Sequence, residues 1–181
     1  MKKNSLLIIR VFLLNLLTSV IYAGIGEFVG INLTRAFKDL KNHNPCLTSK
    51  FSADPGVMEY NGRVYVYGTN DGYLQKSAPS KNEYGKINQI NMMSSADLVN
   101  WADHGSINVS GENGAAKWAS NSWAPTAAHK TINGKEKFFL YFANNANGIG
   151  VLTSDSPTGP WVDPIGKALI SRQTPNCNVE W

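Results

Sequence analysis

Two stretches decide the fold: residues 54–70, DPGVMEYNGRVYVYGTN, and residues 124–144, APTAAHKTINGKEKFFLYFAN. Each contains Asn-Gly followed by a run rich in aromatic and β-branched residues, which favour strands. Asn-Gly between two such runs is a strong signal for a β-hairpin, because both central positions of the turn need a positive φ. The sequence therefore predicts hairpins that turn at Asn61-Gly62 and at Asn133-Gly134.

These hairpins belong to a longer duplicated unit. Each opens with a residue before proline, in Asp54-Pro55 and Ala124-Pro125, and each is followed by a Trp-x-Asp segment that begins at Trp101 or at Trp161. A recurring unit of about four antiparallel strands is typical of a β-propeller blade. We therefore predict an all-β fold with two blades, each an antiparallel four-stranded sheet. The strands expected from the pattern are 56–60, 63–69, 87–94, 124–131, 137–143 and 148–153.

The first 43 residues differ in character from the rest. Basic residues precede an apolar run at 11–22 and a small residue at Ala23, which predicts a secretory signal peptide over 1–23. An uncleaved N-terminal anchor is the alternative, and both place the domain outside the cytoplasm, so we expect a secreted protein. A linker is predicted over 24–43 and the propeller domain over 44–181, with blade one at about 51–110 and blade two at about 118–172.

Charge excludes one class of partner. The chain of 181 residues has a net charge of +4, but from Asn44 onward eleven basic residues balance eleven acidic ones. The basic surface of a nucleic-acid-binding protein is therefore absent. Cys46 and Cys177 share no metal-ligand spacing with each other or with a histidine. A disulfide between the two cysteines is one alternative and a pair of free thiols is the other, and both remain equally open.

The candidate site residues follow from the propeller prediction, because ligands bind where the innermost strands of the blades converge. Asp54 opens the first strand of blade one and is the candidate carboxylate of this ligand site. The alternative is that its carboxylate only caps a turn before proline. Sugars stack on aromatic rings, so Trp123 is the best such candidate, although a core position is equally consistent with it. Three strand-end residues are candidates for contact with sugar hydroxyls, and one further Trp for a subsite rim: Asn70, Asp71, Asn145 and Trp118.

Five segments of the chain, in this order, resemble glycoside hydrolase family 43: FSADPGV (51–57), GRVYVYGTND (62–71), SSADLVNWADHG (94–105), SWAP (122–125) and IGVLTSDSPTGPW (149–161). The resemblance runs from about residue 44 to the last residue. It implies a five-bladed propeller enzyme of the β-xylosidase, α-L-arabinofuranosidase or arabinoxylan arabinofuranohydrolase type, of which this chain holds two blades. The family usually has Asp after the SWAP segment, and Thr126 stands there instead, which favours an arabinofuranosyl substrate.

The resemblance also implies roles. Members of the family hydrolyse glycosides with inversion, and their general base is the Asp that matches Asp54 here. The general acid and the residue that tunes it come from later blades, so we expect an N-terminal fragment that is inactive alone. Many members carry calcium held by a His from a late blade. No cofactor and no metal ligand is therefore expected in this chain, although the complete enzyme can hold calcium.

Two other interpretations stay open. A non-catalytic carbohydrate-binding propeller would keep the aromatic residues and would not need Asp54. A two-blade module that closes a propeller by homo-oligomerisation is the second. For the enzyme we expect a polysaccharide or oligosaccharide substrate, no nucleic-acid partner, no membrane contact apart from the export signal, and a monomeric complete protein.

Overall fold

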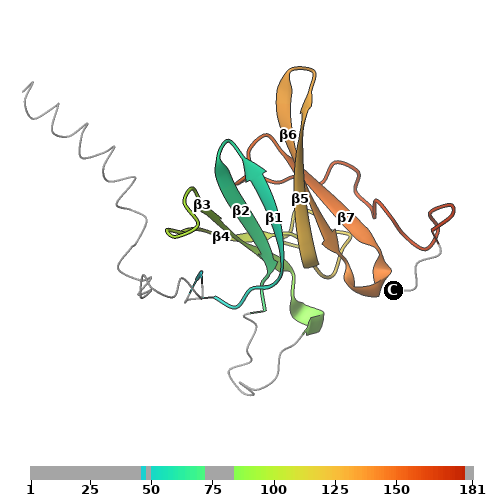
Figure 1. The fold of residues 1–181 in the computed structure, drawn as a ribbon. Helices are drawn as coiled ribbons and strands as arrows, with labels where there is room; N and C mark the ends of the chain where they lie inside the picture. Colours follow the sequence, from blue (N-terminus) through green and yellow to red (C-terminus); the bar gives the residue numbers. More distant parts are fainter. Residues whose placement is uncertain (1–45, 48–49, 72–83, 178–181) are drawn as a thin grey trace, which may run out of the picture. The chain divides into compact units, whose positions relative to one another are not determined.

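The computed structural model describes residues 46–47, 50–71 and 84–177. The predicted leader and linker lie outside the described residues. In these described ranges, seven strands form two antiparallel sheets, one in the order β1-β2-β3-β4 and the other in the order β5-β6-β7 (Figure 1). The strands are β1 (Ala53–Tyr60), β2 (Arg63–Thr69), β3 (Gln89–Ser95), β4 (Ala102–Asn108), β5 (Trp123–Ile132), β6 (Lys135–Ala143) and β7 (Ile149–Ser154).

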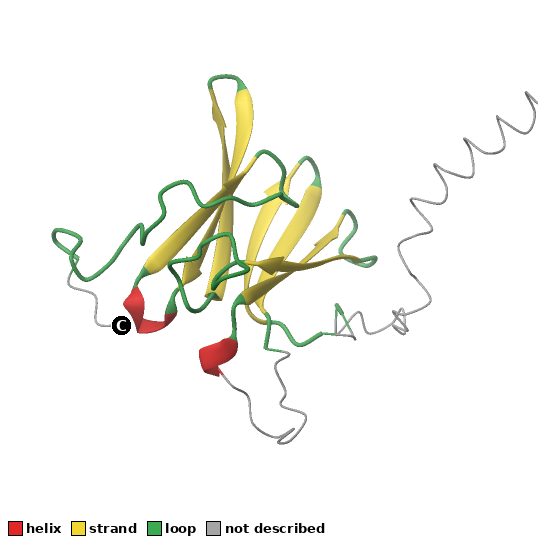
Figure 2. Cartoon of the chain, turned by 180° about the vertical axis from the view of Figure 1, so that it is seen from behind, coloured by secondary structure: helices red, strands yellow, loops and turns green. Residues whose placement is uncertain are grey.

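The helical content of the described residues is limited to two short 3-10 helices, η1 (Tyr84–Lys86) and η2 (Asn145–Asn147). Both lie at the end of the sheets where β1 and β5 begin (Figure 2). The predicted all-β class is therefore confirmed. Within the part of the chain that the structure describes, no helix has the length and apolar character needed to cross a membrane.

Both predicted hairpin turns are confirmed. Asn61 and Gly62 have φ angles of 52° and 70°, and Asn133 and Gly134 have 51° and 74°. The Gly62 amide also donates to Glu59 Oε1 at 2.8 Å, which satisfies a backbone group that the turn leaves without a strand partner. Local turn chemistry is sufficient to place these two hairpins in the sequence.

Strand β4 was not predicted. Its sequence, ADHGSIN, contains a single β-branched residue, and Gly105 has a φ of 88° where the register with β3 shifts. This strand is an edge strand whose backbone pairs with β3, so its neighbour rather than its own composition decides its conformation.

The prediction of four strands in the second sheet was wrong. Within the described residues this sheet has three strands, and the segment that follows β7 pairs with it through two isolated bridges, Thr153–Val162 and Ile149–Ile170. Pro157, Pro160 and Pro164 lie in that segment. Proline has no N–H to donate, so a continuous ladder of hydrogen bonds cannot form along it.

One core joins the two sheets. The ring of Tyr60 at the end of β1 packs edge-on against His129 of β5 and Phe138 of β6, with ring centroids 5.1 and 4.9 Å apart. The fully buried side chains of this core come from both sheets, so neither sheet covers its apolar face alone. The core residues are Met58, Tyr67, Ile90, Met92, Val109, Ala116, Ala119, Phe138, Leu140, Phe142, Leu152 and Trp161.

Tyr67 of β2 connects the first sheet with the segment that follows β7. Its hydroxyl donates to the carbonyl oxygen of Pro157 at 2.6 Å, and its ring packs edge-on against Trp161 with the centroids 6.1 Å apart. Burial, with a smaller contribution from Tyr65, raises the pKa of the Tyr67 hydroxyl far above its ordinary value. The hydroxyl therefore stays protonated and donates throughout the physiological pH range.

We expect Tyr67→Phe to lower the free energy of unfolding by about 1–2 kcal/mol, because the Pro157 carbonyl loses its donor. Urea denaturation followed by tryptophan fluorescence measures the change. Tyr65→Phe is the matched control in the same strand, since its hydroxyl makes no hydrogen bond within the described residues. Equal losses in the two variants would contradict a specific role for the Tyr67 hydroxyl.

Candidate active site

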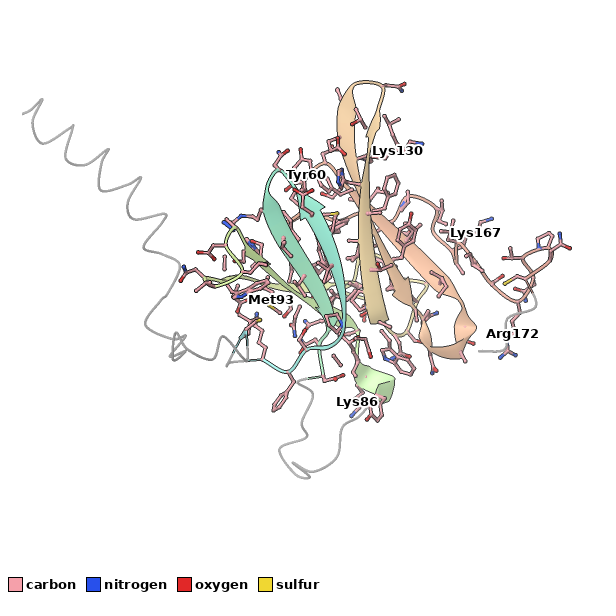
Figure 3. All side chains as sticks on the ribbon, in the orientation of Figure 1. Tyr60, Lys86, Met93, Lys130, Lys167 and Arg172 are labelled. Atoms are coloured by element: carbon pink, nitrogen blue, oxygen red, sulfur yellow. The ribbon has the colours of Figure 1, made fainter. Side chains whose placement is uncertain are left out.

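The site lies at the end of the sheets where strands β1 and β5 begin. The register pairs Ala53 of β1 with Thr69 of β2, and Trp123 of β5 with Ala143 of β6, so the first residues of β1 and β5 sit beside the last residues of β2 and β6. Strands β1 and β5 are the edges of their sheets and contact each other. In Figure 3, Lys86 marks this end of the sheets and Tyr60 marks the opposite, hairpin end.

Asp54 is the predicted catalytic carboxylate, and it lies at this end of the sheets. It is exposed, its φ is 48°, and the register between β1 and β2 shifts across Ala53 and Gly56, so Asp54 and Pro55 bulge out of the ladder. Bulges of this kind re-aim side chains and are common next to active sites. Oδ2 of Asp54 lies 3.4 Å from the hydroxyl of Thr69.

The second sheet repeats this backbone without a carboxylate. Ala124 precedes Pro125, has a φ of 43°, and lies in the same kind of register shift, between Trp123 and Thr126. A positive φ is unusual for a residue with a side chain, and here it occurs with Asp in one sheet and with Ala in the other. The turn therefore forms without an acid, which weakens the alternative that Asp54 only caps a turn.

Gly56 allows β1 to lie directly against β5. A Cβ atom at this position would overlap the carbonyl oxygen of Pro125 and would lie 2.7 Å from the Cα of Thr126. Only glycine permits such a close approach between two backbones. This contact holds the Asp54 bulge of the first sheet against the corresponding bulge of the second.

Trp123 is half-buried at the start of β5, one residue before Ala124. Its indole Nε1 donates to the carbonyl oxygen of Tyr84 at 3.2 Å, so η1 holds the ring from outside the sheets. Sequence reasoning did not select Tyr84, whose side chain is 63% exposed. Its carbonyl oxygen, which also accepts from Asn121 at 3.3 Å, brings it to the site.

Asn70 and Asp71 follow β2 directly and are half-buried. The side-chain Nδ2 of Asn70 donates to Gln89 Oε1 at 2.9 Å. The backbone N–H of Asp71 donates to the carbonyl oxygen of Thr69 at 3.1 Å. Both residues therefore lie at the same end as Asp54. The hydrogen bond to Gln89 ties Asn70 to β3.

Asn145 belongs to the corresponding position after β6. It is exposed, has a φ of 51°, and its side-chain oxygen accepts from the backbone of Ala146 at 2.8 Å. Its neighbour Asn144 is buried, and the Oδ1 atom of Asn144 accepts from the backbone amides of Ser120 and Asn121, both at 3.0 Å. Asn144 thus anchors the segment that leads into Trp123.

Trp118 has a different set of neighbours. Its Nε1 donates to Asp163 Oδ2 at 2.8 Å, and its ring stacks on Phe142 with the centroids 6.2 Å apart. These contacts tie Trp118 to the second sheet and to the segment after it. No contact in the described residues links Trp118 to Asp54.

The other described carboxylates are mostly engaged elsewhere. Asp97 and Asp163 accept from backbone amides of their own turns, and Asp103 pairs with Lys50 at 2.7 Å. Hydrogen bonds from Asn100 and Val99 lower the pKa of Asp97, hydrogen bonds from His129 and Thr131 lower that of Glu136, and a hydrogen bond from Lys137 lowers that of Asp155. A general acid needs a raised pKa, and none of these three has one.

The His, Cys, Asp and Glu side chains of the described residues are dispersed. No group of three or more His, Cys, Asp or Glu side chains comes together within residues 46–47, 50–71 and 84–177. Nε2 of His104 and Oγ of Ser94 form a hydrogen bond of 2.6 Å. Burial, together with the nearby charge of Arg63, lowers the pKa of His104. His129 pairs with Glu136, and both histidines have structural partners.

Comparison with known protein families and curated sequences gives a consistent result. Residues 42–175 match the family model described as Glycosyl hydrolases family 43. The arabinoxylan arabinofuranohydrolase of Paenibacillus polymyxa is 51% identical over 149 residues, which are 77% of this chain and 24% of that protein. The one of Bacillus subtilis (strain 168) is 51% identical over 157 residues, 82% of this chain and 31% of that protein.

Solved structures agree with the sequences. The crystal structure of a glycoside hydrolase family 43 arabinoxylan arabinofuranohydrolase from Bacillus subtilis, in complex with cellotetraose, aligns with a TM-score of 0.70 at 52% identity, over 74% of this chain and 29% of that chain. An α-L-arabinofuranosidase from Clostridium thermocellum ATCC 27405 aligns with a TM-score of 0.53 at 42% identity, over 71% and 39%. This chain spans a quarter to a third of the length of the two curated relatives.

Proposed function

Because the chain belongs to glycosyl hydrolases family 43, we propose that it forms the first two blades of a five-bladed enzyme that hydrolyses O-glycosidic bonds in plant cell-wall hemicellulose. The proposed substrate is an arabinofuranosyl side chain of arabinoxylan, since two relatives with 51% identity are arabinoxylan arabinofuranohydrolases. The observation that carries the proposal is the exposed carboxylate of Asp54 on a backbone that the second sheet builds with Ala124.

In the proposed mechanism, Asp54 is the general base. Its carboxylate takes a proton from a water molecule, which attacks the anomeric carbon from the face opposite the leaving group and inverts its configuration. A carboxylic acid about 6.5–9.5 Å away protonates the departing oxygen. Hydrogen bonds lower the pKa values of Asp97, Glu136 and Asp155, the opposite of what this acid needs, and we place the acid in a part of the full-length protein outside the described residues.

The neighbours of Asp54 would hold the sugar. We propose that Trp123 stacks against the sugar ring, because its indole is half-buried and fixed by the Tyr84 carbonyl beside Ala124. Asn70, Asp71 and Asn145 lie at the strand ends around this position and are proposed to bind sugar hydroxyls. Trp118 is proposed for the rim of a subsite, although its indole nitrogen is already bound to Asp163.

The direct test uses the full-length protein that contains this chain and soluble arabinoxylan. Chromatography should detect released arabinose, and proton NMR during the first turnovers should show the inverted anomer. Absence of arabinose, or initial formation of the retained anomer, would contradict the proposal.

We expect the 181-residue chain by itself to release arabinose more slowly than the full-length protein by a factor of about 100 or more, because leaving-group protonation alone contributes that much. Equal amounts of the two proteins in the same assay measure the ratio. Comparable rates would mean that the 181-residue chain holds a complete catalytic pair. The same measurement on an aryl arabinofuranoside controls for loss of polymer binding.

A carbohydrate-binding propeller without catalysis is the second candidate. It is favoured by accessible aromatic residues: Trp123 at the start of β5 is half-buried, and Tyr84, whose carbonyl holds Trp123, and Phe51, which precedes β1, are each 63% exposed. Such a module would bind oligosaccharides without releasing a product. We further propose that the protein is exported, on the basis of the leader pattern over residues 1–23, and that the complete protein is a monomer.

A further inference from the structure

Thr69 is the last residue of β2, and its side chain contacts both sheets. Residue Thr69 is 2% exposed. Its Oγ1 atom lies 2.8 Å from the backbone nitrogen of Ala124 in β5 and 3.4 Å from Oδ2 of Asp54 in β1. One buried hydroxyl therefore touches the candidate base and the neighbouring sheet.

The chemistry of the groups assigns the direction of both contacts. A backbone N–H can only donate, so Oγ1 of Thr69 accepts from Ala124. The hydroxyl proton then remains for a second partner, and an ionised carboxylate only accepts. Thr69 therefore donates to Oδ2 of Asp54, while Oδ1 makes no hydrogen bond within the described part of the chain.

The second sheet provides an internal comparison. Thr69 pairs with Ala53 in the first sheet, and Ala143 pairs with Trp123 in the second, so Ala143 occupies the position that corresponds to Thr69. Ala124 occupies the position of Asp54 and has nearly the same φ. The hydroxyl and the carboxylate are thus both present in the first sheet and both missing in the second, which makes the same turn without them.

We propose that Thr69 is a positioning residue for the general base, an inference that rests on the proposed function. Its hydroxyl holds Oδ2 of Asp54 and leaves Oδ1 for the attacking water. The accepted bond from Ala124 fixes the hydroxyl in turn, so the orientation of the carboxylate depends on the contact between the sheets. Misplacement of a reacting group by about 1 Å can reduce a rate by about 10²-fold.

The experiment compares three variants of Thr69 in the full-length protein. Thr69→Val has nearly the same shape but no hydroxyl, and we expect kcat on arabinoxylan to fall by about 10- to 100-fold with KM within about twofold. Thr69→Ser keeps the hydroxyl and should stay within about threefold of the wild type. Thr69→Ala should behave like Thr69→Val and should fold, because Ala143 holds the same position in the second sheet.

Thr153→Val is the matched control. Thr153 is also a buried threonine in a strand, 7% exposed in β7, and the described contacts do not connect its side chain to Asp54. We expect it to leave kcat unchanged even if its loss of stability equals that of Thr69→Val. An equal fall of kcat in both variants would overturn the proposal, because the effect would then follow stability.

Crystal structures of the wild type and of Thr69→Ala separate this inference from the proposed function. A rotated Asp54 carboxylate in the variant supports positioning, whatever the activity of the protein. An unchanged carboxylate overturns it. If the wild type releases arabinose and Asp54→Asn does not, but Thr69→Val and Thr69→Ala match the wild type, the proposed function stands and the role of Thr69 is overturned.

Discussion

Replacement of Asp54 by Asn in the full-length protein is expected to lower kcat on arabinoxylan by about 10³-fold or more. An amide cannot take a proton from water at neutral pH, and general base catalysis contributes about 10²- to 10⁴-fold. Asn has nearly the same shape as Asp, so KM should change little. Steady-state kinetics of arabinose release measure both parameters.

Asp155→Asn is the control for this substitution. Asp155 is an exposed carboxylate in the turn after β7 that pairs with Lys137 at 2.9 Å. Its removal should leave kcat within about twofold, because isolated surface ion pairs contribute little to stability. If Asp54→Asn retains more than a tenth of the wild-type kcat, Asp54 is not the general base.

The turn-capping interpretation of Asp54 makes a different prediction about stability. Because Ala124 makes the same turn in the second sheet, Asp54→Ala should change the free energy of unfolding by no more than about 0.5 kcal/mol, the usual range of surface substitutions. If the carboxylate capped the turn, its loss would lower the free energy of unfolding by more than this.

A carbohydrate-binding module without catalysis would keep its oligosaccharide affinity in Asp54→Asn and show no activity in the wild type.

Gly56→Ala is expected to lower the free energy of unfolding by about 3 kcal/mol, at the upper end of the typical cost of overpacking. The new Cβ would meet the Pro125 carbonyl oxygen and the Thr126 Cα, and both are backbone atoms that cannot rotate away. The two sheets would have to separate where Asp54 lies. We therefore expect kcat to fall as well, even under conditions where the variant is fully folded.

Gly85→Ala is the matched control. A Cβ at Gly85 meets nothing within 4 Å, so this variant should unfold at the wild-type denaturant concentration. Chemical denaturation of both variants, followed by tryptophan fluorescence, gives the comparison. A wild-type midpoint for Gly56→Ala would show that the two strands can move apart at no cost.

Local signals in the sequence predicted most of the strands, but not those whose pairing depends on a neighbour. The hairpins at Asn61-Gly62 and Asn133-Gly134 depend on turn residues that need a positive φ, and these are visible in the chain itself. Strand β4 pairs only because β3 offers its edge, so its polar sequence carries little signal. Pro157, Pro160 and Pro164 after β7 are visible in the sequence, and they prevent the fourth strand that the repeat predicts.

The candidate site divides in the same way. Asp54 could be selected from its place before proline at the start of a repeated hairpin, and from the resemblance to a family. Tyr84 could not be selected, because it reaches the site through a contact with Trp123, 39 positions away in sequence. Thr69 could not be selected either, because the pairing of β1 with β2 brings its hydroxyl to Asp54 and the contact between the sheets brings it to Ala124, 55 positions away. Trp118 was selected as a rim residue, and its bond to Asp163 appears only in three dimensions.

The sequence by itself determined the β class, the two hairpins and the carboxylate, since turn geometry and residue chemistry act over a few neighbouring positions. The tertiary structure alone decided how closely β1 and β5 approach, which hydroxyl meets the carboxylate and how many strands each sheet holds. These features depend on packing between segments that are far apart in the chain, and no local pattern encodes which distant partner a side chain will contact.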